Sequence, residues 1–88
     1  MYEATAKFFQ KDDNYGAFPI IDTFREPTAD LLEERLETAL GIQLSSWERG
    51  AISALKVITD EDHPADAGFP FPKGTATGVW NISVIRTA

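Results

Sequence analysis

Cysteine is absent from this sequence of 88 residues, and histidine occurs only once. The lack of cysteine excludes disulfide bonds, thiolate metal sites and thiol nucleophiles. Positive charge is also scarce, with 8 Lys and Arg against 14 Asp and Glu and a formal net charge of −6. A negative surface repels the phosphates of nucleic acids, so we expect no direct nucleic-acid contact and a preference for basic protein partners.

Long apolar runs are missing as well, and none approaches the roughly 20 residues of a membrane-spanning helix. Residues 1–5 show neither the basic patch nor the apolar stretch of a signal peptide. The sequence therefore predicts a cytoplasmic protein with no membrane contact. A chain of 88 residues has room for one hydrophobic core. We expect residues 1–88 to form a single domain, and association with a copy of itself stays open.

Alternation of apolar and polar residues predicts three strands. The first covers residues 2–9, the second residues 17–24 and the third residues 79–85. Pro19 cannot donate a hydrogen bond to a neighbouring strand, so the second strand is expected to lie at a sheet edge or to begin after the proline.

Two helices are predicted between the second and third strands. The first begins at Pro27-Thr28, which suit a helix start, and runs to about Leu40 before Gly41, a typical C-terminal cap. The second begins with Ser45-Ser46-Trp47-Glu48, a capping box, and continues to about Ile58 with Trp47 on its buried side.

This order of elements predicts an α+β fold of the type ββααβ, a short antiparallel three-stranded sheet with two helices packed on one face. Residues 59–78 show no periodicity and contain several prolines and glycines. They are therefore predicted to form a long irregular loop, a feature that is usually functional in so small a domain.

The acidic residues fall into two blocks. In the first helix they recur at i, i+3, i+4 and i+7, which predicts one exposed face of carboxylates that repel one another because no lysine separates them. The second block lies in the predicted loop. Such charges are often simply solvated, but together they form a candidate surface for a basic partner. The candidate partner-binding carboxylates are Asp30, Glu33, Glu34, Glu37, Asp60, Glu61, Asp62 and Asp66.

Phe69 and Phe71 alternate with prolines in the same loop. An extended, rigid segment of this kind can present two aromatic anchors to a partner, so both residues join the candidate binding set. The alternative is that both rings fold back over the small core.

Catalytic and metal-binding patterns are not found. His63 lies among acidic residues, but an EF-hand loop counted from Asp60 would need glycine at Ala65 and glutamate at Phe71. No serine has an evident base, and the carboxylates of the first helix are expected on the solvent side, where nothing raises a pKa. We predict no catalytic residue, no metal and no cofactor, and hence no enzyme.

Three residue patterns together suggest a family. The hairpin around residues 14–18, the acidic helix ending in Leu40-Gly41-Ile42, and the last strand beginning Gly78-Val79-Trp80-Asn81 resemble small phage-encoded type I-F anti-CRISPR proteins. The resemblance implies an acidic inhibitor that acts as a nucleic-acid (DNA) mimic in the bacterial host cell and occupies a basic nucleic-acid-binding surface. The leading prediction is accordingly a non-enzymatic acidic module that docks on a basic protein surface.

Two alternatives stay open. Residues 36–47 resemble the turn of helix-turn-helix proteins, which would make the chain a small DNA-binding regulator, although Glu37 stands where that family has a small residue. The other alternative is a phage structural or assembly subunit that completes its core through Phe69 and Phe71 against a second copy.

Overall fold

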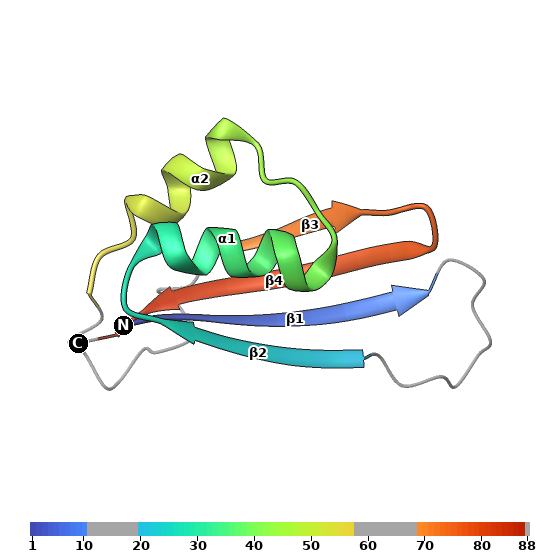
Figure 1. Cartoon of the computed structure of the whole chain (residues 1–88), viewed down its shortest axis with the longest axis horizontal. Helices are drawn as coiled ribbons and strands as arrows, with labels where there is room; N and C mark the ends of the chain where they lie inside the picture. Colours follow the sequence, from blue (N-terminus) through green and yellow to red (C-terminus); the bar gives the residue numbers. More distant parts are fainter. Residues whose placement is uncertain (11–19, 58–68, 88) are drawn as a thin grey trace.

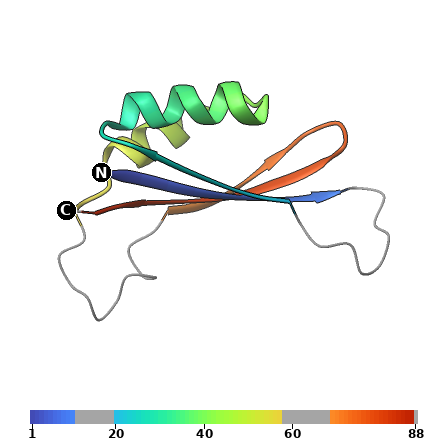
Figure 2. The same ribbon diagram turned by 60° about the horizontal axis from the view of Figure 1, so that its bottom comes forward.

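The computed structural model describes residues 1–10, 20–57 and 69–87 (Figure 1). Its elements are β1 (Tyr2–Gln10), β2 (Ile20–Glu26), α1 (Ala29–Leu40), α2 (Ser46–Ser53), β3 (Phe69–Gly74) and β4 (Gly78–Arg86). The four strands form one antiparallel sheet in the order β2-β1-β4-β3, and Figure 2 shows both helices on the same face of it. The predicted α+β class, antiparallel sheet and one-sided helix layer are confirmed.

The predicted ββααβ order and strand number are wrong, because part of the expected loop is a strand. Phe69–Gly74 forms β3, and the observed order is ββααββ with four strands. Proline normally interrupts a strand because it has no N–H to donate. At a sheet edge, however, every second N–H points away from the neighbouring strand, and a proline at such a position loses no hydrogen bond.

The helix starts follow the sequence, whereas one helix end does not. The Thr28 hydroxyl accepts from the Leu31 N–H, Gly41 ends α1 with φ 65°, and Ser45 and Glu48 form the predicted capping box. α2 ends at Ser53 rather than near Ile58. Beyond the end of α2, the carbonyl of Leu55 accepts a hydrogen bond from Arg86 of β4 at 3.3 Å.

The core lies between the helices and one face of the sheet. Small side chains on β1 let the helices approach its centre, and larger ones from the neighbouring strands and helices fill the space around them. β2 begins after Pro19 and lies at an edge, as predicted. In the described ranges no helix is long and apolar enough to span a membrane. The buried apolar residues are Tyr2, Ala4, Ala6, Phe24, Leu32, Leu36, Leu40, Leu44, Ile52, Phe71, Ile82 and Val84.

Candidate functional site

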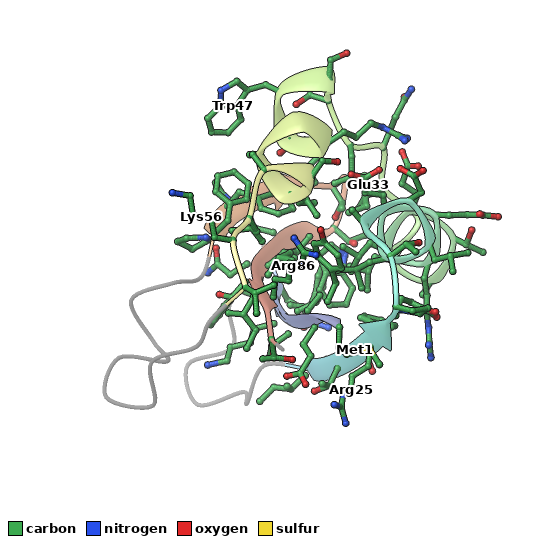
Figure 3. The ribbon with its side chains drawn as sticks, turned by 90° about the vertical axis from the view of Figure 1, so that its left-hand side faces the viewer. Met1, Arg25, Glu33, Trp47, Lys56 and Arg86 are labelled. Carbon is green, nitrogen blue, oxygen red and sulfur yellow. The ribbon has the colours of Figure 1, made fainter. Side chains whose placement is uncertain are left out.

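The predicted stripe of four free carboxylates on α1 is wrong, because two of them face α2. Glu33 is 3% exposed and lies between the helices, as Figure 3 shows, with its carboxylate 3.9 Å from the Arg49 guanidinium and 3.5 Å from the Ser53 hydroxyl. Glu37 accepts hydrogen bonds from Arg49 and, at 2.9 Å, from the Leu44 N–H. Glu33 and Glu37 therefore make contacts that link α1 to α2, and they do not form part of an exposed surface for a partner.

The environment of these two side chains shifts their pKa values in opposite directions, and the rise at Glu33 contradicts the expectation that nothing raises a pKa on this helix. Burial raises the pKa of Glu33, although the positive charge of Arg49 opposes the shift. The Leu44 N–H and the Arg49 guanidinium lower the pKa of Glu37 because both stabilise the charged form. Glu37, which departs from the helix-turn-helix pattern, is thus the residue that fixes the connection between α1 and α2.

Of the four predicted carboxylates on α1, only Asp30 and Glu34 are exposed. The predicted second acidic block, residues 60–66 with His63, lies outside the described residues. The described ranges hold eight acidic and seven basic side chains, a net of −1 out of the chain's −6. The part of the chain that the structure describes is therefore nearly neutral, and α1 does not carry the acidity of the protein as an ordered surface.

The two predicted aromatic anchors pack inward. Phe71 is 5% exposed and belongs to the core, and Phe69 stacks on it with ring centroids 5.3 Å apart. This contradicts the use of Phe71 as an exposed anchor and confirms the alternative, in which both rings cover the core. Trp47, predicted to be buried, is 70% exposed and meets the Phe69 ring in an edge arrangement with centroids 5.3 Å apart, and Figure 3 shows it projecting from the first turn of α2.

A partly buried ion pair that the sequence did not reveal links β3 to α2. Lys73 of β3 donates to the Glu48 carboxylate at 2.6 Å, and the same carboxylate accepts from the Ser45 N–H at 2.7 Å. Burial raises the pKa of Glu48, but the hydrogen bonds from Lys73 and Ser45 outweigh it, and the pKa lies below its usual value. Nothing in a local sequence pattern links positions 48 and 73, since the contact depends on how the sheet edge meets the helix.

Two backbone hydrogen-bonded residue pairs establish which backbone groups point out of the sheet. The Thr75 N–H donates to the Gly78 carbonyl at 2.7 Å, and Met1 and Thr87 exchange bonds of 2.8 and 3.0 Å. In antiparallel pairs, bonded and non-bonded residue pairs alternate. With the strand registers of this sheet, both residue pairs lead to the same pattern on β4, whose even-numbered residues bond to β3 and odd-numbered residues to β1.

The alternation assigns opposite properties to the two edge strands. On β3 two of the three outward positions are held by Pro70 and Pro72, which have no N–H to offer, and the third is Gly74 at the end of the strand. On β2 the even-numbered residues bond to β1, so the outward positions are Ile21, Thr23 and Arg25. Each of these three offers both an N–H and a C=O, and within residues 1–10, 20–57 and 69–87 no strand pairs with them. We call these three residues the β2 edge.

Side chains around the β2 edge are exposed and chemically mixed. Ile20 and Ile21 are each 56% exposed. On the helix side of the sheet, Arg35 of α1 bonds to Glu26 at 3.0 Å and lies over the Phe24 ring, 5.3 Å from its centroid. Leu31, one helical turn before Arg35, is 45% exposed and lies on the same side of α1. Sequence reasoning located this edge through Pro19 but not its outward residues.

Among the described residues, no group of three or more His, Asp or Glu side chains is arranged to hold a metal ion. Comparison with protein-family models, curated proteins and solved structures gave no significant match. Among the described residues, the β2 edge stands out because its backbone N–H and C=O groups can form hydrogen bonds that the described fold does not use.

Proposed function

We propose that this chain is a non-enzymatic protein-binding module that pairs a strand of its partner with the β2 edge. The observation that supports the proposal is the difference between the sheet edges: β3 presents two prolines outward, while β2 presents three residues whose outward N–H and C=O groups pair with no other described strand. Strand addition to an open edge gives affinity through main-chain hydrogen bonds, and the side chains beside the edge supply specificity.

Asp22 limits which strands can pair with the β2 edge. It is exposed and points to the helix side of the sheet, next to the outward residues. A charged side chain on that side of an edge strand opposes pairing with an unsuited partner, because its charge would face the incoming strand without compensation. The matching strand carries, or brings with it, a lysine or arginine near Asp22. This agrees with the expectation of a basic partner.

The earlier hypotheses receive unequal support. Asp30 and Glu34 are the two carboxylates of the predicted set that stay exposed on α1, so docking on a basic surface through them stays a prediction. That the basic surface belongs to a nucleic-acid-binding complex stays a prediction from the resemblance. No observation favours the DNA-binding alternative, because Arg49 is engaged by Glu33 and Glu37. The assembly subunit built on Phe69 and Phe71 is not favoured either, since both rings pack inward.

The proposal is tested by selecting binders from a displayed library of random peptides. Thr23→Pro removes an outward N–H without removing a bond to β1, and Thr23→Val is the matched control because it keeps that N–H. Wild type and Thr23→Val should enrich extended peptides that carry Lys or Arg, and Thr23→Pro should not. Equal enrichment on Thr23→Pro, or none on wild type, would contradict the proposal.

A further inference from the structure

We infer that the strand taken up by the β2 edge is β2 of a second copy of this chain, paired antiparallel about a two-fold axis at Thr23. The inference rests on the proposed function and names its partner. Such pairing is isologous, since each copy presents the same surface to the other.

The backbone supports a register centred on Thr23. The outward residues Ile21, Thr23 and Arg25 are placed symmetrically about that position. In this register Thr23 faces Thr23 of the second copy, and Ile21 faces Arg25 of the second copy. Every outward N–H and C=O of the β2 edge then finds a partner, as in an ordinary antiparallel ladder.

Charge distinguishes this register from its neighbours. With a two-fold axis perpendicular to the sheet, the axis passes through one residue position of β2. The two neighbouring registers are therefore centred on position 22 or on position 24. The first places Asp22 opposite Asp22 of the second copy, and the second places Asp22 opposite Glu26 of the second copy. Like charges directly opposite each other destabilise a strand pair. The register centred on Thr23 avoids both contacts.

The same register supplies the cation that Asp22 requires. Asp22 comes to lie opposite Phe24 of the second copy, on the helix side of the sheet. In each copy Arg35 lies over the Phe24 ring, 5.3 Å from its centroid. The carboxylate of Asp22 therefore approaches the guanidinium of Arg35 across the junction, and the symmetry makes this contact twice. The charge of Asp22 opposes pairing with other strands and favours pairing with β2 of a second copy.

Apolar contacts add to the junction on both faces. On the open face, the exposed Ile21 packs along the aliphatic part of Arg25 of the second copy. On the helix face, the outer sides of the two α1 helices, each with an exposed Leu31, approach the same seam. The pairing covers side chains that are otherwise 45–56% exposed.

The opposite edge of each copy ends the assembly. The dimer is a continuous sheet of two four-stranded halves, and both of its outer edges are β3. Of the three outward positions there, Pro70 and Pro72 hold two and Gly74 holds the third, so the edge lacks two of the three N–H groups that a further strand would need. The pairing therefore closes at two copies instead of growing into a fibre.

The test is the mass of the full chain in solution, measured by sedimentation equilibrium over a wide range of protein concentration. Wild type and Thr23→Val should dimerise. Thr23→Pro should raise the dissociation constant at least roughly 30-fold, because two hydrogen bonds at the axis are lost. Circular dichroism melts check that each variant is folded.

A charge exchange tests the register itself. Asp22→Arg alone places like charges at both contacts with Arg35, and Arg35→Glu alone does the same with Asp22, so each variant should be monomeric. Mixed together, the two variants face each other with opposite charges at both contacts and should form a heterodimer. Failure of the mixture to associate, with both variants folded, would overturn this register.

A wild type that stays monomeric at every concentration would overturn the inference. If Thr23-dependent peptide selection still succeeds, the proposed function survives with a different partner. If peptide selection fails as well, the proposed function and the inference about its partner are both contradicted. Should Arg35→Glu not fold, the Thr23→Pro and Thr23→Val pair still decides the question.

Discussion

The two edges of the sheet carry opposite chemistry, although both belong to one four-stranded layer. β3 presents Pro70 and Pro72 outward, buries Phe71 in the core and is tied to α2 through Lys73. β2 presents intact backbone groups and exposed isoleucines. An open edge invites unwanted association, and proteins usually protect it. Since this chain blocks one edge with prolines but leaves the backbone groups of the other intact, with the charge of Asp22 selecting among strands, the β2 edge is best explained by a matching strand that pairs with it.

The largest expected difference between the edges concerns folding stability. Phe71→Ala removes a core ring from β3 and should lower the free energy of unfolding by about 3–5 kcal/mol. Ile21→Ala on β2, at a side chain that is 56% exposed, should change it by less than about 1 kcal/mol when the protein is dilute and monomeric. Urea denaturation of both variants at the same low concentration measures the contrast. Equal losses of stability in the two variants would contradict this difference between the edges.

The Lys73–Glu48 pair should have the next largest effect. Lys73→Met leaves the Glu48 carboxylate buried without its cation and should cost about 1–3 kcal/mol at pH 7. Since the pKa of Glu48 is lowered in the folded state, its stabilisation is present above pH ~4.5 and is lost as the pH falls through the lowered value. The deficit of Lys73→Met should therefore shrink on acidification.

Lys56→Met is the control for the Lys73 experiment, because Lys56 is exposed and makes no ion pair with another described residue. It should change stability little at any pH. A deficit of Lys73→Met that stays constant from pH 7 to pH 3 would show that the ion pair is not its cause.

Opening the protected edge should produce a smaller change in stability but a visible change in assembly. Pro72→Val restores an outward N–H on β3 and should alter the free energy of unfolding by less than about 1 kcal/mol. Because both edges would then accept strands, we expect species larger than the dimer at high concentration, measured by light scattering. An unchanged mass distribution would show that Pro72 does not limit assembly.

The smallest expected effect is the pH dependence from Glu33. Its pKa is raised by burial, so the folded state holds this proton more tightly and the contribution of Glu33 to stability falls as the pH rises above ~4.5. Glu33→Gln should therefore gain stability relative to wild type between pH 4 and pH 7, as followed by urea denaturation. Glu34→Gln, at an exposed position, serves as the control. A relative loss for Glu33→Gln would contradict the direction of the shift.

Local signals were enough for the helix starts and for one sheet edge. Thr28, Gly41 and Ser45 act on backbone groups within a few residues, so their roles could be predicted from sequence alone. Pro19 in the same way placed β2 at an edge. β3 could not be predicted, because its prolines are acceptable only once β4 lies on the other side and the hydrogen-bond alternation is known.

The candidate site depended on contacts distant in sequence. Helical spacing placed Glu33 and Glu37 on one side of α1, but whether that side meets solvent depends on where α2 packs. Trp47 had the helical spacing of a core residue, yet it lies in the first turn of α2 and is 70% exposed. The outward residues of β2 follow from a bond between Thr75 and Gly78, on the far side of the sheet.

Amide hydrogen exchange along β2, followed by NMR as protein concentration increases, tests the use of this edge most directly. The amides of Asp22 and Phe24 bond to β1 and should be protected at every concentration. The amides of Ile21, Thr23 and Arg25 should exchange freely in dilute protein and become protected as it is concentrated. Outward amides that stay unprotected at all concentrations would contradict pairing of β2 with a second copy.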